Sequence, residues 1–327
     1  MSNNLGTIDG WIKSTIDRSQ QATRLKQIYE LQAQFLFNQY EPTKASPSEA
    51  GTSFIQRLER WISSFDDPND SWSAYHSLRY FFFIGQQETE ELYRCSVQHK
   101  FLPWLSEQIE ADIFSGNLSE ILQQEIKRCW PCPVTDSLRI NSLLHRTALD
   151  GQDLRPDWLS LRELGDCRRI QAYVAKHDVK YLILFEDFVG SGSQCKRAAR
   201  FALRAFSGPI LLVPLVACHP GDETLRSLAA NSNGRLTYSP VIVLGADCLV
   251  RETRSENEPN SFESLRLAMQ HGYEKGQFNF DSGGAYGYDG VGSLVSSYSN
   301  CPNNTPPIFH AKSASWPFPL FPRKRRA

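Results

Sequence analysis

Residues 181–194, YLILFEDFVGSGSQ, combine carboxylates, glycines and hydroxyls in one short stretch. Five apolar or aromatic residues run directly into Glu186 and Asp187, and the chain then enters a loop of glycine and serine. Glycines let a backbone approach an anion closely, and a helix that begins near Cys195 would face it with unpaired amides. We therefore expect an anion site in the loop formed by Gly190, Ser191, Gly192, Ser193 and Gln194.

The adjacent carboxylates restrict what the anion can be. Two negative side chains repel a phosphate unless they engage another part of the same ligand, and a sugar phosphate meets this condition. Its phosphate would lie in the loop while Glu186 and Asp187 accept hydrogen bonds from ribose hydroxyls. Other phosphate motifs fit less well, because the Walker A lysine is absent and Cys195 replaces the third glycine of G-x-G-x-x-G.

The segments around this loop predict where it lies in the fold. After about residue 130, strand-length apolar runs at 179–185, 209–217 and 240–245 alternate with amphipathic stretches at 161–176, 194–206 and 222–231. Apolar strands joined by helices indicate a parallel sheet covered on both faces. Ligands of such sheets bind beyond the carboxyl ends of the strands, which is where the acidic pair and the loop are expected.

The first part of the chain predicts a helical module. Between about residues 8 and 125, apolar residues recur at intervals of three and four, as in Ile55, Leu58, Trp61 and Ile62. The predicted helices cover 12–40, 54–64, 71–85, 87–98, 102–114 and 117–128. The aromatic cluster at 80–83 is interpreted as the packed face of one of these helices.

Composition places the chain among globular proteins. Of its 327 residues 41% are hydrophobic and 12% aromatic, and the net charge of −1 offers no general attraction for nucleic acid or an anionic membrane. No signal peptide and no membrane-length apolar run is visible, so we expect a cytoplasmic protein without membrane contact. The eight cysteines are scattered, which favours reduced thiols.

The closest cysteine pair is Cys129-Trp-Pro-Cys132. It follows a polar, helical stretch, whereas a redox C-x-x-C motif follows a strand and opens a helix. No second pair or histidine pair lies at zinc-binding spacing, so we expect no metal held by protein ligands. We interpret the pair as a helix end stopped by Pro131 and Pro133.

The stretch LILFEDFVGSGSQ resembles the phosphoribosyl-pyrophosphate loop of type I phosphoribosyltransferases, with Gln194 where those enzymes usually have threonine. Three further motifs narrow the resemblance: PVTDSLRINSLLHR at 133–146, NCPNNTPPIF at 300–309 and WPFPLFPR at 316–323. Together they resemble the phosphoribosyltransferase-like proteins of bacterial conflict systems, PRTase-CE, over about residues 53–323. The resemblance implies an α/β fold with a type I phosphoribosyltransferase-like parallel sheet core, an N-terminal all-helical module at 1–128, and a domain at 129–327 whose C-terminal part, from about 250, is an irregular hood.

The resemblance also implies a function. It indicates an effector of anti-phage defence that binds phosphoribosyl pyrophosphate or a nucleotide, with Mg²⁺ held through ligand oxygens and with protein partners from the same gene cassette. Glu186 and Asp187 would orient the ribose during glycosyl transfer or hydrolysis. The alternative is a non-catalytic sensor in which the same pocket regulates a partner protein.

Other residues are weaker candidates for ligand contacts. Arg139, His145 and Arg146 would suit a pyrophosphate, and equally suit the solvated face of a helix. Tyr286 and Tyr288, in the glycine-rich stretch 281–292, could stack on a nucleobase, while the turn at 303–305 would fix the hood. The basic run at 323–326 is either simply solvated or a local contact to RNA or DNA.

Overall fold

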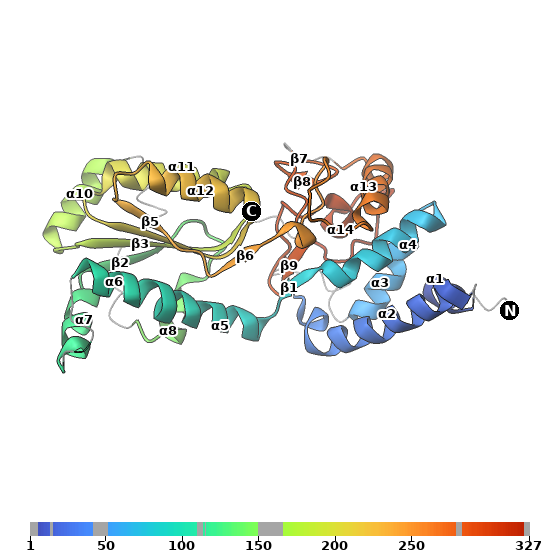
Figure 1. The fold of residues 1–327 in the computed structure, drawn as a ribbon, viewed down its shortest axis with the longest axis horizontal. Coiled ribbons are helices and arrows are strands. Elements are labelled where there is room, and N and C mark those ends of the chain that lie inside the picture. Colours follow the sequence, from blue (N-terminus) through green and yellow to red (C-terminus); the bar gives the residue numbers. More distant parts are fainter. Residues whose placement is uncertain are drawn as a thin grey trace. The chain divides into compact units, whose positions relative to one another are not determined.

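Figure 1 shows the computed structural model, which describes residues 6–13, 16–41, 52–109, 114, 116–149, 166–278 and 283–323. The chain divides into two compact units. Gln87–Leu244 form the sheet unit, and Met1–Gln86 together with Gly245–Ala327 form the terminal unit. The predicted domains divided the chain differently, at 128/129. The N-terminal helices and the C-terminal segment fall in one unit because their side chains share one hydrophobic core.

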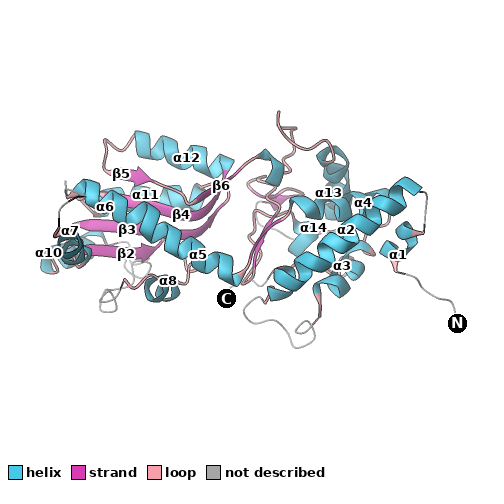
Figure 2. Ribbon diagram, turned by 60° about the horizontal axis from the view of Figure 1, so that its bottom comes forward, coloured by secondary structure: helices cyan, strands magenta, loops and turns pink. Residues whose placement is uncertain are grey.

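The sheet unit is built on five parallel strands, which Figure 2 shows in magenta. The order is β2-β3-β4-β5, and β6 pairs with the far end of β4. The strands are β2 (Cys129–Pro133), β3 (Tyr181–Val189), β4 (Ile210–Cys218), β5 (Leu236–Tyr238) and β6 (Ile242–Leu244). All nine residues of β4 are buried, as expected for a strand covered on both faces. The predicted parallel α/β sheet is thus confirmed.

Helices cover both faces of this sheet (Figure 1). On one face, α10 (Cys167–Lys176), α11 (Ser193–Ala205) and α12 (His219–Ala230) pack on alternate residues of β3 and β4. On the other lie α5 (Gln86–Ser96) and α6 (Leu102–Gln108), whose Trp104 donates to Thr237 Oγ1 at 3.1 Å. The remaining helices among the described residues of this unit are α7 (Leu118–Ile126), α8 (Ile140–Arg146) and the π-helix η3 (Val97–Phe101).

The terminal unit is mainly helical. Its elements are α1 (Thr7–Ile12), α2 (Ile16–Phe35), η1 (Phe37–Gln39), α3 (Phe54–Ile62), α4 (Pro68–Ser77), η2 (Leu78–Tyr80), η4 (Ala246–Cys248), α13 (Phe262–Gly276) and α14 (Pro307–His310), with the short strands β1 (Phe82–Ile84), β7 (Gly283–Gly284), β8 (Gly287–Tyr288) and β9 (Val295–Ser297). β1 pairs in parallel with β9, which joins the N-terminal part of the unit to the C-terminal part. The indoles of Trp61 and Trp316 both donate to the carbonyl of Ile308.

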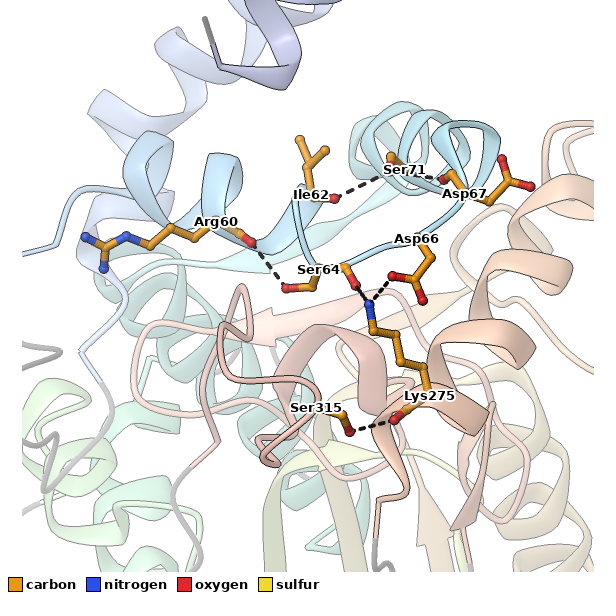
Figure 3. Close-up of polar contacts among 8 residues, drawn as sticks. All are labelled: Arg60, Ile62, Ser64, Asp66, Asp67, Ser71, Lys275 and Ser315. Carbon is orange, nitrogen blue, oxygen red and sulfur yellow. Dashed lines mark hydrogen bonds and ion pairs between the residues drawn. The ribbon is translucent and has the colours of Figure 1, made fainter. Parts of the chain in front are cut away.

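A lysine connects three segments of the terminal unit that are distant in sequence (Figure 3). Lys275 Nζ, on α13, donates to the carbonyl of Ser64 at 2.8 Å and to Asp66 Oδ1 at 2.5 Å, both in the loop between α3 and α4. The hydroxyl of Ser315 donates to the carbonyl of Lys275 at 2.6 Å. These bonds fix the C-terminal segment against α13 and the α3–α4 loop.

Two local predictions were wrong. Cys129–Cys132 is not a helix end but strand β2, because Pro131 and Pro133 sit on an edge strand where their missing N–H groups cost no ladder bond. Val134, the next residue with an inward N–H, donates to Phe185 O at 2.8 Å. The helix expected over 71–85 ends at Ser77, and 82–84 form strand β1.

The aromatic cluster at 80–83 was nevertheless correctly assigned to packing. Phe81 and Phe83 are both buried in the core of the terminal unit, where their rings contact Phe321. The predicted helices at 12–40, 54–64, 87–98, 102–114 and 117–128 correspond to α2, α3, α5, α6 and α7, each of which is shorter than predicted, whereas α1 lies almost entirely before the first predicted helix. In the described part of the chain, no helix has the length and apolar character needed to span a membrane.

The ion pair between α13 and α4 predicts a pH dependence of stability. His271 Nδ1 lies 2.8 Å from Asp70 Oδ2, and this hydrogen bond raises the pKa of His271. A raised histidine pKa stabilises the fold below about pH 6.5, and the contribution is lost as the pH rises through the folded pKa. The His271 side chain is half-exposed, so we expect less than about 1 kcal/mol.

The measurement is denaturant unfolding of the wild type and His271→Gln between pH 5 and pH 8, followed by tryptophan fluorescence. The difference in unfolding free energy between the two proteins should shrink as the pH rises. A constant difference across the range would show that the ion pair does not contribute.

Candidate functional site

The acidic pair lies inside strand β3 rather than beyond its end. β3 continues to Val189, and its ladder with β4 pairs Glu186 with Pro214 and Val189 with Ala217. Glu186 is 2% exposed, whereas Asp187 is half-buried. Since consecutive strand residues point to opposite faces, the two carboxyl groups occupy different surroundings.

The loop that follows β2 binds both carboxylates. Thr135 donates twice to Glu186, from its backbone N–H to Oε2 at 3.0 Å and from its hydroxyl to Oε1 at 2.8 Å. Ser137 donates to Asp187 Oδ1 at 2.8 Å, and Asp187 Oδ1 also accepts the N–H of Phe188 at 2.9 Å. The Thr135 and Ser137 hydroxyl oxygens are 2.5 Å apart. One hydroxyl network therefore connects the carboxyl ends of β2 and β3.

The glycine-serine loop has the backbone geometry of an anion site. Gly192 has φ +81° and is the N-cap of α11, a conformation that an L side chain rarely adopts. The backbone N–H groups of Gly190, Ser191 and Gly192 donate to no other group in the described part of the chain. Ser191 Oγ lies 3.1 Å from Ser193 Oγ. The loop thus presents amides and hydroxyls at the positive end of a 13-residue helix.

A neighbouring helix start holds this loop in place. Gly221, in the first turn of α12, lies so close to the loop that a Cβ there would be 2.5 Å from Gly190 O and 2.7 Å from Val189 Cγ1. A Cβ on Gly192 would in turn lie 3.1 Å from Gly221 O. Two glycines therefore allow the two backbones to meet without side chains between them.

The first turn of α12 is itself fixed by an ion pair between the buried Asp222 carboxylate and the exposed Arg226 guanidinium. Asp222 Oδ2 accepts a hydrogen bond from Arg226 Nε at 2.7 Å, and this bond raises the pKa of Arg226. Tyr238, at the end of β5, is buried, and burial raises its pKa well above the usual range. The Arg226 guanidinium lies 5.7 Å from the centre of the Tyr238 ring. These contacts connect the support of the glycine loop to the last residue of β5.

The predicted pyrophosphate contacts lie in the same unit as the acidic pair. Arg139 is the exposed N-cap of α8, immediately after the loop that carries Thr135 and Ser137. Arg146, at the end of α8, forms an ion pair with Glu90 of α5 at 2.9 Å, and His145 is exposed. Of these three residues, Arg139 is the nearest along the chain to the hydroxyl network.

The predicted base contacts belong to the terminal unit. Tyr286 is buried and its hydroxyl accepts a hydrogen bond from Gln270 Nε2 at 3.0 Å. Tyr288 is half-buried, and its carbonyl accepts Asn304 Nδ2 at 3.0 Å. Its N–H donates to Asn303 O at 2.8 Å. The turn at 303–305 therefore fixes the glycine-rich segment, as predicted from its composition.

Several predicted features fall partly outside the described residues, including positions 281–282 of the glycine-rich stretch, positions 324–326 of the basic run and positions 161–165 of the helix predicted at 161–176. Within the described residues, Arg323 donates its backbone N–H to His310 O at 3.0 Å.

The residues that sequence reasoning missed are Thr135, Ser137 and Gly221. The first two could have been found had 129–133 been recognised as a strand, because hydroxyl residues would then follow a strand neighbouring β3. Gly221 gave no such signal, since its role depends on a contact between two backbones that are far apart in sequence.

A family model described as PRTase-CE matches residues 58–323. The chain belongs to the PRTase-CE family. In this PRTase-CE protein the match includes the hydroxyl network, the glycine loop and most of the terminal unit, and it confirms the resemblance that the sequence motifs indicated. No curated protein and no solved structure matches the chain.

The close backbone contact predicts that Gly221→Ala displaces the glycine loop. The added methyl group has no room, so we expect a loss of about 1–3 kcal/mol in the free energy of unfolding. Denaturant unfolding measures it. The control is Gly10→Ala in α1, where a Cβ meets no atom within 4 Å and stability should be unchanged or raised by up to about 1 kcal/mol. Equal stability of the two variants would contradict the tight contact.

Proposed function

We propose that this PRTase-CE protein binds a 5′-phosphorylated ribose, as phosphoribosyl pyrophosphate or a nucleotide, at the carboxyl ends of β2 and β3. In this proposal it is a phosphoribosyltransferase-like effector that acts on nucleotides or nucleic acid. The observation that carries the proposal is the glycine loop at the start of α11. Its backbone amides donate to no group in the described part of the chain, and the loop begins three residues after the half-buried Asp187 carboxylate.

The two halves of the site suit the two ends of a sugar phosphate. The amides of Gly190, Ser191 and Gly192 and the hydroxyls of Ser191 and Ser193 would surround the phosphate without introducing a buried cation. Asp187 would accept hydrogen bonds from ribose hydroxyls, which are stronger than neutral ones because the acceptor is ionised. A free phosphate would satisfy only the loop, whereas a ribose 5-phosphate satisfies both.

Magnesium enters the proposal with the ligand. Mg²⁺ keeps several waters and binds through one or two carboxylates together with substrate phosphates. Within the described ranges, no group of three or more His, Cys, Asp or Glu side chains could hold a metal ion by itself. Phosphate oxygens and water would therefore supply most of the ligands of the bound ion.

The cellular part of the proposal rests on family membership. We propose that the protein acts in anti-phage defence together with partner proteins from the same gene cassette. Plaque formation on cells that carry the cassette tests this part, with Asp187→Asn in place of the wild-type gene. Protection that survives the substitution would separate the defence role from the sugar-phosphate site.

The site predicts a specific binding defect. In isothermal titration with Mg²⁺ and phosphoribosyl pyrophosphate, Asp187→Asn should bind at least about 10-fold more weakly than the wild type, because it loses charge-assisted hydrogen bonds worth about 1.5–3 kcal/mol. Asp178→Asn is the matched control, since its side chain is 73% exposed and pairs with Arg128. Equal affinity in Asp187→Asn and the wild type would refute the assignment of the ribose to this carboxylate.

The same proteins separate catalysis from sensing. Phosphoribosyl pyrophosphate and nucleotides are incubated with the protein and Mg²⁺, and pyrophosphate, free base and ribose products are followed over time. Turnover that requires Asp187 supports the enzyme, and saturable binding without products supports a sensor that regulates a partner. The sensor is the second candidate function. It is favoured by Glu186, whose carboxylate is almost inaccessible and accepts hydrogen bonds from Thr135 through both oxygens.

A further inference from the structure

The segment 134–138 forms the β2 side of the candidate site, and its contacts with β3 set its position. Val134 N–H extends the β2–β3 ladder to Phe185 O at 2.8 Å, so the loop leaves the sheet directly beside the acidic pair. Thr135 then meets Glu186 and Ser137 meets Asp187. Thr135 and Ser137, two positions apart in the loop, thus bind the consecutive residues Glu186 and Asp187 of the neighbouring strand.

The Glu186 carboxylate is engaged from within the protein. With 2% exposure it is nearly inaccessible, and each oxygen accepts one hydrogen bond from Thr135. Burying a carboxylate lowers the free energy of unfolding unless the carboxylate accepts such bonds. Removing one of the donors leaves a buried oxygen unsatisfied, which costs more free energy than a typical hydrogen bond contributes. The energetic consequence is that Glu186 fixes the position of Thr135, and with it the loop.

Ser137 transmits this position to Asp187. Its hydroxyl donates to Asp187 Oδ1 at 2.8 Å and lies 2.5 Å from Thr135 Oγ1. Each hydroxyl has a single proton to donate, so the Thr135 and Ser137 hydroxyls supply two protons. Three oxygen–oxygen contacts share these protons: Glu186 to Thr135, Thr135 to Ser137, and Ser137 to Asp187. A ligand hydroxyl that donates to Asp187 would therefore free Ser137 to donate to Thr135.

We propose that Thr135 and Ser137 are positioning residues for the sugar end of the ligand, with Glu186 as the buried anchor and Asp187 as the group that contacts the ribose. This inference rests on the proposed function and assigns separate roles to the two acidic residues. Its distinctive consequence concerns selectivity. Removing the Ser137 hydroxyl should weaken recognition of the ribose hydroxyls while leaving the phosphate contacts intact.

The test compares three probes by isothermal titration: ribose 5-phosphate, 2-deoxyribose 5-phosphate and 3-deoxyribose 5-phosphate. The wild type should prefer ribose 5-phosphate over at least one deoxy sugar by about 10-fold or more, because that sugar leaves Asp187 without one donor. In Ser137→Ala and Thr135→Val this preference should fall at least about 3-fold. Ser191→Ala, in the phosphate loop, should instead weaken binding of all three sugars by the same factor.

Conservative variants serve as controls. Thr135→Ser and Ser137→Thr keep the hydroxyls and should retain the wild-type preference, which a general loss of stability would not explain. Thr147→Val removes a hydroxyl that donates to Leu143 O at 2.8 Å in the same unit and should change neither affinity nor preference. Thermal unfolding of every variant verifies folding, and if Thr135→Val does not fold, Ser137→Ala against Ser137→Thr decides the question.

The outcomes distinguish this inference from the proposed function. Sugar-phosphate binding with an unchanged preference in folded Ser137→Ala would overturn the inference and leave the proposed function standing. Failure of the wild type to bind any of the three sugar phosphates would refute the proposed function and the inference together.

Discussion

The candidate site depends on a carboxylate that the protein buries within its own sheet. Glu186 is 2% exposed, and both of its oxygens accept hydrogen bonds from one residue of the loop after β2. Because a buried charge without partners costs several kcal/mol, the loop cannot move away from β3 without a large loss of stability. The position of that loop then determines where Ser137 and Asp187 lie.

The phosphate half of the site depends instead on glycines, which have no side chains. Gly192 adopts a left-handed conformation, and Gly221 of α12 meets the carbonyl of Gly190 with no Cβ between them. The backbone amides of the loop are thereby held at the start of α11, where the helix dipole favours an anion. Asp187 accepts a hydrogen bond from the hydroxyl network and precedes the glycine loop by three residues, and it is the half-buried member of the acidic pair.

Much of this architecture is predictable from sequence, for identifiable physical reasons. β4 is apolar throughout and β3 is apolar up to Phe185, so the burial of these runs on both faces, the parallel sheet and the glycine loop at its carboxyl end all follow from local pattern. β2 did not follow, because Pro131 and Pro133 imitate a helix stop and are tolerated only since the strand is at an edge. Because this strand was not predicted, Thr135 and Ser137 were not recognised as residues at the carboxyl end of a strand next to β3. The shared core of the two chain ends was also beyond local pattern, because it depends on contacts such as Trp61 to Ile308.

The central claim is that the loop at 190–193 binds the phosphate of a ribose 5-phosphate whose sugar meets Asp187. A crystal structure of the protein grown with ribose 5-phosphate tests it most directly. The account predicts phosphate density within hydrogen-bonding distance of the backbone N–H groups of Gly190, Ser191 and Gly192, and a ribose hydroxyl on the Asp187 carboxylate. Density for the sugar phosphate elsewhere, with the loop amides bound only to water, would contradict it.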